Sequence, residues 1–291
     1  MTTWLLYFLA IIFLLVALIL TSDSHDVVRF HARFLLYYIV SSTIAVMGIP
    51  YIMLRPKDVR NCRDLSALLK QVTKILGIQW ELRGAAELSV ERGCVVVANH
   101  QSTLDILGMF NIWQVMGKCA PVAKQAIFYA WPFGLAAWLA GVVFIDKRTP
   151  GKAVATLNET SKLVNTRKVK MWIFPEGTRN NNIIAKGMLP FKKGAFRIAI
   201  ENQVPLLPIV YSPYYFINHR NHYFGRGKVI VQTLKPVPTE GLGLKDVDDL
   251  MERTQKMMRE ALKELTKEVL APLPPDYPGL QGIEIPKTEM S

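Results

Sequence analysis

Two long apolar blocks begin the chain, ahead of a longer part in which short apolar runs alternate with amphipathic segments. The blocks, residues 4–20 and 34–54, contain no charged side chain. Because a membrane-spanning helix needs about 20 mostly apolar residues, both blocks are long enough to span a bilayer, the first only just. The pattern predicts a two-helix membrane hairpin over residues 1–58. Gly48 and Pro50 leave a kinked hairpin within one leaflet as the alternative.

Charged residues beside the blocks predict the orientation of this hairpin. Arg55, Lys57, Arg60 and Arg63 follow the second block, whereas the loop between the blocks balances two arginines with two aspartates. Since basic residues are enriched on the cytoplasmic side of membrane segments, we expect the rest of the protein in the cytoplasm. The first block lacks the basic start and the cleavage site of a secretory signal, which favours an uncleaved anchor.

The chain from residue 59 onward alternates strand-like and helix-like segments, which is typical of an α/β domain. Seven short apolar runs are candidate strands of a single sheet flanked by helices, at residues 78–82, 94–98, 121–123, 142–145, 169–174, 206–211 and 228–234. We therefore expect an α/β domain over residues 59–271. A proline-rich, loosely ordered tail is expected over residues 272–291.

A third apolar run, residues 126–145, is divided by Pro132, Gly134 and Gly141. We expect a helix at or near the membrane interface followed by a core strand. A third membrane span is disfavoured because it would place the charged motifs of the chain on opposite faces of the membrane. Amphipathic patterns predict further helices at residues 149–164, 192–202 and 246–269.

The chain carries a formal net charge of +12 at pH 7. No nucleic-acid-binding motif accompanies this charge, so anionic lipid headgroups and phosphorylated substrates fit it better than DNA or RNA. Its three cysteines, Cys62, Cys94 and Cys119, form no Cys-x-x-Cys pair, so neither a disulfide framework nor a zinc site is indicated. His219 and His222 are interpreted as surface histidines because the pair alone is too sparse for a metal site.

The heptapeptide NHQSTLD follows an unbroken β-branched strand and contains a histidine and a carboxylate, His100 and Asp105. Ser102 can cap the helix that follows, which leaves His100 in the turn and Asp105 in the first helical turn, so that the two side chains can meet. A carboxylate that accepts one ring N–H leaves the other ring nitrogen as a general base. A capping box formed by Ser102 and Asp105 is the alternative.

Two further strands run directly into charged residues. The motif FIDKR ends in Lys147 and Arg148, which could receive a phosphate, and FPEGTR holds Glu176 and Arg179 in a tight turn. Because α/β sheets bind ligands at the carboxyl ends of their strands, the three motifs together would supply a base, cations and orienting carboxylates. Solvated loops, or an ion pair between Glu176 and Arg179, are the alternatives.

Several common catalytic motifs are missing from the sequence. There is no Gly-x-Ser-x-Gly elbow, no Gly-x-x-x-x-Gly-Lys-Ser/Thr phosphate loop and no His-Glu-x-x-His zinc motif. We therefore expect the histidine to act directly on a substrate hydroxyl, without a metal or another cofactor.

The three motifs, together with VPLLPI at residues 204–209, resemble the ordered blocks of the glycerolipid acyltransferases over about residues 60–270. Within that group the chain looks most like the animal 1-acyl-sn-glycerol-3-phosphate acyltransferases. The resemblance implies transfer of a fatty acyl group from the co-substrate acyl-CoA to the sn-2 hydroxyl of lysophosphatidic acid. It also implies an endoplasmic reticulum membrane location, contact with membrane lipids, and a catalytic domain on the cytoplasmic side.

The resemblance assigns roles residue by residue. His100 would be the general base and Asp105 its orienter. The residues implied to bind the lysophospholipid headgroup are Glu176, Gly177, Thr178 and Arg179. Lys147 stands where the family usually has arginine and Arg148 follows it, so either could meet the phosphate. Backbone N–H groups near Ser102 are candidate donors to the developing oxyanion.

Three other functions fit the same residues. An acyltransferase for glycerol-3-phosphate or another lysophospholipid would share the His/Asp pair. A hydrolase would use Ser102 as a nucleophile with His100 as its base. A non-catalytic lipid-binding membrane protein would keep the fold without the chemistry. No pattern in the sequence predicts an acyl-chain preference or an oligomeric state.

Overall fold

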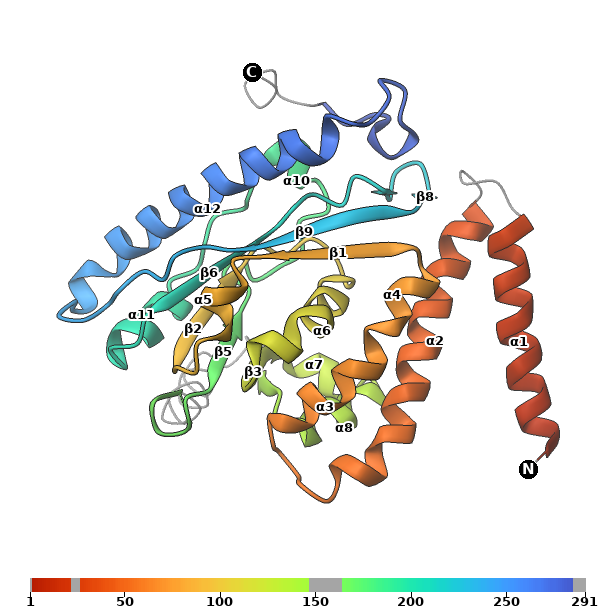
Figure 1. Ribbon diagram of the computed structural model, residues 1–291, viewed down its shortest axis with the longest axis horizontal. Coiled ribbons are helices and arrows are strands. Elements are labelled where there is room, and N and C mark those ends of the chain that lie inside the picture. The colour runs from red at the N-terminus through yellow and green to blue at the C-terminus, as the bar shows by residue number, and fades with distance from the viewer. Residues whose placement is uncertain (1, 22–26, 147–163, 285–291) are drawn as a thin grey trace.

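The computed structural model describes residues 2–21, 27–146 and 164–284 (Figure 1). Its centre is a seven-stranded sheet of order β1-β9-β6-β2-β5-β3-β4, which confirms the predicted α/β architecture. All neighbouring strands are parallel except β6 and β9. The strands are β1 (Ile78–Arg83), β2 (Cys94–Ala98), β3 (Cys119–Lys124), β4 (Val143–Ile145), β5 (Lys170–Ile173), β6 (Leu206–Tyr211) and β9 (Gly227–Thr233).

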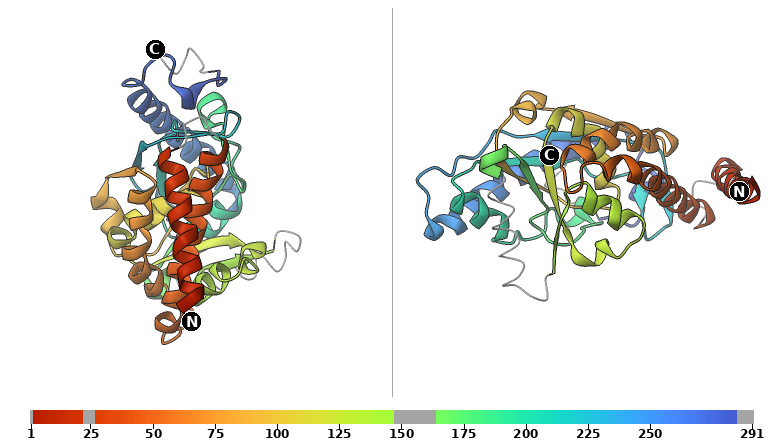
Figure 2. Two further views of the ribbon diagram at one scale, coloured as in Figure 1. Left: turned by 90° about the vertical axis from the view of Figure 1, so that its right-hand side faces the viewer. Right: turned by 90° about the horizontal axis from the view of Figure 1, so that it is seen from below.

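Helices cover both faces of this sheet (Figures 1 and 2). They are α3 (Arg60–Leu69), α4 (Gln71–Ile75), α5 (Ala85–Ser89), α6 (Asp105–Met116), α7 (Gln125–Phe128), α8 (Phe133–Leu139), α10 (Ile183–Lys186), α11 (Gly194–Glu201) and α12 (Val247–Leu270). One apolar core joins α3, α4 and α6 to Val96 of β2, and the other joins α11 and α12 to Val95 and Val97. Successive strand residues point to opposite faces, so the unbroken apolar run of β2 serves both cores.

All seven predicted strands are present, with small differences at their ends. The structure adds a short hairpin of β7 (Ile217–Asn218) and β8 (Tyr223–Phe224), which the pattern did not predict because two-residue strands carry almost no periodicity. The predicted helices at 192–202 and 246–269 correspond to α11 and α12. The one predicted at 149–164 lies outside the described residues except for its last, Val164, which is helical and buried.

The apolar run at residues 126–145 forms two short helices, α7 and α8, followed by β4, so the expected strand is confirmed and the single helix is wrong. Gly134 lets the start of α8 pack closely against the end of α7. A Cβ atom at this position would lie 2.0 Å from the carbonyl oxygen of Phe128, so only glycine allows the two segments to pack this closely.

Two helices precede the sheet domain, α1 (Thr2–Thr21) and α2 (Val27–Ile52), and they lie side by side at one end of the molecule (Figures 1 and 2). Among the described residues only α2 is long and apolar enough to cross a membrane, with a mean hydropathy of 1.6 over its best window. The described residues therefore show one helix with the length and composition of a membrane span, and the predicted two-helix membrane hairpin is not confirmed.

The second helix also begins earlier than its apolar block, because its first turns are bound to the sheet domain. Arg33 is buried, and its guanidinium donates to the carbonyl oxygens of Leu76 and of Gly225, the latter at 3.1 Å. The same guanidinium lies over the Phe224 ring, 4.4 Å from its centroid. Burial of the Arg33 charge is tolerated because it has these partners. All of them belong to the sheet domain, so α2 is docked on that domain along the face that carries Arg33.

Candidate active site

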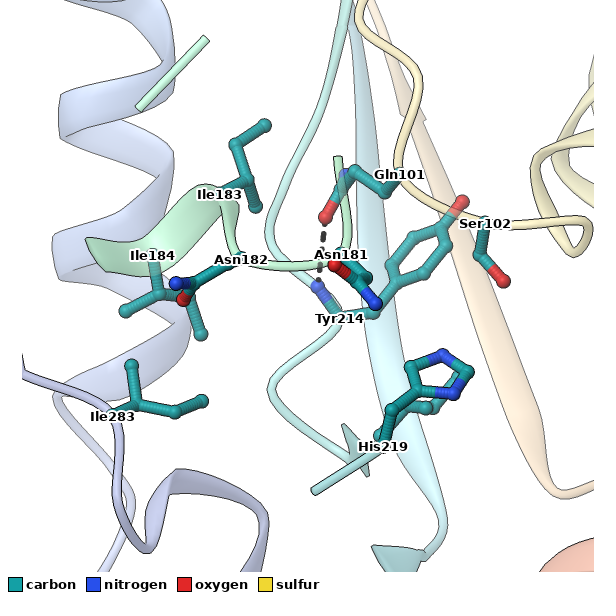
Figure 3. A pocket seen from close by; sticks show the side chains of 10 residues that line it. Gln101, Ser102, Asn181, Asn182, Ile183, Ile184, Tyr214, His219 and Ile283 are labelled. Atoms are coloured by element: carbon teal, nitrogen blue, oxygen red, sulfur yellow. Dashed lines mark hydrogen bonds between the residues drawn. The ribbon is translucent and has the colours of Figure 1, made fainter. Parts of the chain in front are cut away.

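The site is built on the loop of residues 99–105, which joins β2 to α6 and which we call the 99–105 loop. Asn99 is fully buried, donates to the backbone oxygen of Tyr211 at 3.1 Å, and accepts the Tyr211 N–H at 2.8 Å. Gln101 donates to the Ser212 oxygen at 2.9 Å and accepts the Tyr214 N–H at 3.1 Å (Figure 3). These two amide side chains fasten the loop to the end of β6.

His100 and Asp105 meet as the sequence predicts. Nδ1 of His100 lies 2.6 Å from a carboxylate oxygen of Asp105. The Asp105 side chain is fully buried, whereas the histidine side chain is 21% exposed. The same carboxylate accepts the backbone N–H groups of Gln101 at 2.8 Å and of Ser102 at 3.2 Å. Three donors thus hold one carboxylate, and the imidazole can present its other nitrogen to a substrate.

The regular helix α6 begins at Asp105, with Leu104 in the N-cap position and no side-chain hydrogen bond from Leu104. Ser102, the predicted cap, lies two residues before Leu104. Its hydroxyl accepts the Leu104 N–H at 3.3 Å and its own N–H is donated to the Asp105 carboxylate at 3.2 Å, so the two side chains make reciprocal bonds of the capping-box type. The N–H groups of Gln101 and Ser102, which were candidate oxyanion donors, are engaged by the Asp105 carboxylate. The carboxylate is the stronger acceptor because it is charged, which explains why it takes both amides.

Phe174 and Glu176 position His100 from the end of the neighbouring strand β5. The Phe174 ring stacks on the imidazole with centroids 4.1 Å apart and an interplanar angle of 17°. Glu176 is buried, and its two oxygens accept the backbone N–H of His100 at 2.8 Å and that of Leu189 at 2.9 Å. Burial raises the pKa of the Glu176 carboxyl, and these two N–H groups partly offset that rise. The alternative of an ion pair with Arg179 does not occur.

Gly177 forms the tight turn that follows. Its φ of +69° lies in the left-handed region, where a side chain is strained. A Cβ atom there would also lie 3.0 Å from Cε of Lys192. The segment after this turn contacts His100 again, because the N–H of Asn180 donates to the backbone oxygen of His100 at 2.7 Å. Thr178 and Arg179, between these anchors, are exposed.

A pocket of about 450 Å³ adjoins the 99–105 loop. Its lining residues are Phe30, His31, Phe34, Tyr38, Gln101, Ser102, Thr103, Thr178, Arg179, Asn181 and His219. Among these described residues there are cationic, hydroxyl and amide side chains but no carboxylate. Such a lining suits an anionic group, since it offers donors and a fixed positive charge.

His219 and His222 lie against α2 near this pocket. His219 is exposed and His222 is half-buried, which agrees with their interpretation as surface histidines. The imidazoles pack on the Phe30 ring with centroid distances of 5.4 and 5.5 Å. Partial burial, and then the nearby Arg179, lower the pKa of His219. His219 is also one of the residues that, with Ser102 and Tyr214, line a smaller cavity of about 20 Å³ (Figure 3).

α2 reaches the 99–105 loop directly. The hydroxyl of Tyr37 donates to the Thr103 backbone oxygen at 3.2 Å, and that of Tyr38 to the Thr103 hydroxyl at 3.4 Å. No local pattern marks these tyrosines, because their partner lies more than 60 residues away. The membrane-type helix is therefore one wall of the candidate site.

Lys147 and Arg148 lie outside the described residues. The preceding strand β4 runs parallel to β3 and ends at Ile145, on the same edge of the sheet as the ends of β2 and β5. Within the described part of the chain, no group of three or more His, Cys, Asp or Glu side chains is arranged to hold a metal ion.

Comparison with known proteins places this architecture in a family. A family model described as "Acyltransferase" matches residues 79–212. The chain is 41% identical over 226 residues to 1-acyl-sn-glycerol-3-phosphate acyltransferase alpha of Bos taurus, covering 77% of each chain. It is 32% identical over 256 residues to the beta enzyme of Homo sapiens, covering 87% of this chain and 90% of the relative.

A solved structure has the same fold. It is the 1-acyl-sn-glycerophosphate (LPA) acyltransferase PlsC from Thermotoga maritima, with a TM-score of 0.63 and 22% identity. The match covers 82% of this chain and 97% of that one. The motifs, the sheet topology and the relatives agree, and the chain belongs to the 1-acyl-sn-glycerol-3-phosphate acyltransferases, enzymes of lipid biosynthesis.

Proposed function

We propose that this enzyme transfers a fatty acyl group from acyl-CoA to the sn-2 hydroxyl of lysophosphatidic acid, giving phosphatidic acid and free CoA. The names of its relatives support the acceptor, because 1-acyl-sn-glycerol 3-phosphate is lysophosphatidic acid. The observation that carries the chemistry is the 2.6 Å contact between His100 and Asp105 beside a pocket lined with donors.

His100 acts as the general base in this proposal. Its Nδ1–H is donated to Asp105, so Nε2 accepts the proton of the acceptor hydroxyl while that oxygen attacks the thioester carbon. The tetrahedral intermediate then collapses, the C–S bond breaks, and the imidazolium returns its proton to the CoA thiolate. Base assistance of this kind contributes about 10²- to 10⁴-fold. The thioester already has a good leaving group, so no covalent acyl-enzyme is required.

The headgroup phosphate binds in the pocket in this proposal. Arg179 and Thr178 are its exposed donors, and a guanidinium can meet two phosphate oxygens at once. Glu176 and Gly177 act indirectly in this proposal. Glu176 holds the backbone of His100, and Gly177 forms the turn that precedes Thr178 and Arg179. Lys147 and Arg148 are proposed as further phosphate ligands.

The membrane location follows from the substrates. Both carry acyl chains that partition into the bilayer, and α2 combines the length of a span with direct contact to the 99–105 loop. We place the enzyme in the endoplasmic reticulum membrane with its sheet domain on the cytoplasmic side, where acyl-CoA is available.

Substitution of His100 tests the base. In purified enzyme supplied with lysophosphatidic acid and acyl-CoA, His100→Ala should lower kcat by about 10²-fold or more with little change in KM. Ser102→Ala is the comparison variant for the hydrolase alternative. Its hydroxyl accepts one N–H within the turn and lines the pocket, so we expect its loss to affect KM at most and to leave kcat unchanged. Equal kcat values for wild type and His100→Ala would reject the base. Loss of activity in Ser102→Ala, with an acyl-serine trapped in the wild type, would instead identify a serine hydrolase.

The acceptor is tested with a panel of lysophosphatidic acid, glycerol-3-phosphate and lysophosphatidylcholine. We expect kcat/KM to be highest for lysophosphatidic acid, since the pocket suits a phosphate monoester and α2 supplies apolar surface. A higher kcat/KM for either of the other acceptors would replace the proposed substrate while leaving the His100 chemistry intact.

A further inference from the structure

A second space adjoins the pocket described above along α2. It is an open groove of about 620 Å³ between α1 and α2. Its lining residues are Leu15, Val27, Val28, His31, Ala32, Phe34, Leu35 and Tyr38. Apart from His31 and Tyr38 these side chains are apolar. Such a groove is within the size range of ligand sites and suits a hydrocarbon chain better than a polar group.

The groove and the pocket share one wall. His31, Phe34 and Tyr38 line both spaces, and their spacing of three and four residues places them on one face of α2. They extend over about 10 Å of helix, at 1.5 Å per residue. At the pocket side of this wall, the Tyr38 hydroxyl donates to Thr103 of the 99–105 loop. The apolar groove and the polar pocket therefore adjoin along the stripe formed by His31, Phe34 and Tyr38.

The chemistry of the two spaces is complementary to one kind of molecule. On one side of the stripe lie Arg179, Thr178 and Asn181, and on the other the apolar groove. A lipid with an anionic headgroup and one acyl chain has the same division along its length. We propose that the acyl chain of the acceptor lysophospholipid lies in the groove between α1 and α2, while its phosphate occupies the pocket beside Arg179. This inference rests on the proposed function.

The chain of the acceptor fits the groove better than the chain of the donor. In lysophosphatidic acid only a glycerol unit separates the phosphate from the acyl ester, so the two parts can lie in two spaces that share the side chains of His31, Phe34 and Tyr38. In acyl-CoA the long pantetheine arm separates the phosphates from the acyl chain. Phosphate donors directly beside an apolar groove therefore match the acceptor.

Leu35→Trp tests the proposal by filling the groove. Leu35 is exposed and lines the groove but not the pocket, so a larger side chain should leave folding and headgroup contacts intact. KM and kcat are measured for lysophosphatidic acids with chains of 10 to 18 carbons. We expect KM to rise about tenfold for the longest chains, which is 1.4 kcal/mol of binding, with little change for the shortest. Met47→Trp is the control, since Met47 is exposed on the same helix and lines neither space.

Three results would overturn the inference. They are an unchanged KM, an equal change at all acceptor lengths, or a shift in the preferred chain length of acyl-CoA instead. A second measurement is independent of turnover: lysophosphatidic acid with a photoreactive group at the end of its chain should label the α1–α2 segment, and labelling confined to the sheet domain would contradict the groove. Wild-type enzyme without activity toward lysophosphatidic acid would reject the proposed function, whereas normal wild-type activity with either contrary result rejects only the groove.

Discussion

Asp105 has two tasks at the scale of the single residue. Its carboxylate receives the ring of His100 and also two backbone N–H groups of the 99–105 loop. Hydrogen bonds to a charged group contribute about 1.5–3 kcal/mol each, so the group that orients the base also fixes the loop that carries it. Replacement of Asp105 would therefore disturb structure and chemistry together, which makes His100 the better residue for testing the base.

Gly177→Ala tests whether the turn positions the headgroup donors. The positive φ and the contact with Lys192 should together cost about 1–3 kcal/mol of stability and shift Arg179. We expect KM for lysophosphatidic acid to rise about tenfold, equivalent to 1.4 kcal/mol. Gly187→Ala is the control, because Gly187 also has a positive φ, of +63°, and a Cβ atom there meets nothing within 4 Å. An equal KM increase in both variants would show that general backbone strain is responsible.

The elements of this protein differ in how far the sequence predicts them. β2 was predicted to the residue, because an unbroken β-branched run is a local signal. The predicted cap of α6, Ser102, lies two residues before the observed N-cap position, Leu104, because the Ser102 hydroxyl and the Asp105 carboxylate hold a turn that precedes the regular helix. The contact between Tyr37 and Thr103 was out of reach, since it joins residues far apart in the chain and depends on how α2 docks. Local pairs were therefore predictable, and the far wall of the pocket was not.

Arg33→Met tests the docking of α2. The substitution keeps much of the apolar volume but leaves the carbonyl oxygens of Leu76 and Gly225 without their donor. Loss of a charged donor to buried acceptors costs about 1–3 kcal/mol, so we expect lower thermal stability in detergent and reduced activity. Arg55→Met is the control, because the ion pair of Arg55 with Asp64 is solvent-accessible, and such surface pairs contribute little to stability. Equal melting temperatures for the two variants would contradict a docking role for Arg33.

At the scale of the whole molecule, buried contacts attach the sheet domain to α2, a helix with the length and composition of a membrane span. The basic residues that follow this helix predict that the domain is accessible from the cytoplasm. Protease added outside sealed microsomes should cleave segments after residue 60, and detergent should not be needed for that cleavage. A domain shielded until the membrane is dissolved would reverse the proposed orientation. A lumenal marker protein, protected in the same vesicles, confirms that they are sealed.

The catalytic pair and the pocket wall come from different parts of the chain, so the two can change independently among related enzymes. The base and its orienter come from one short connection between β2 and α6, which the end of β5 supports through Phe174 and Glu176. The wall opposite Arg179 comes from α2 and from the β7–β8 turn, which lie far away in sequence. Exchange of residues 27–38 between related chains should therefore change which lipid is accepted while the catalytic step is inherited unaltered.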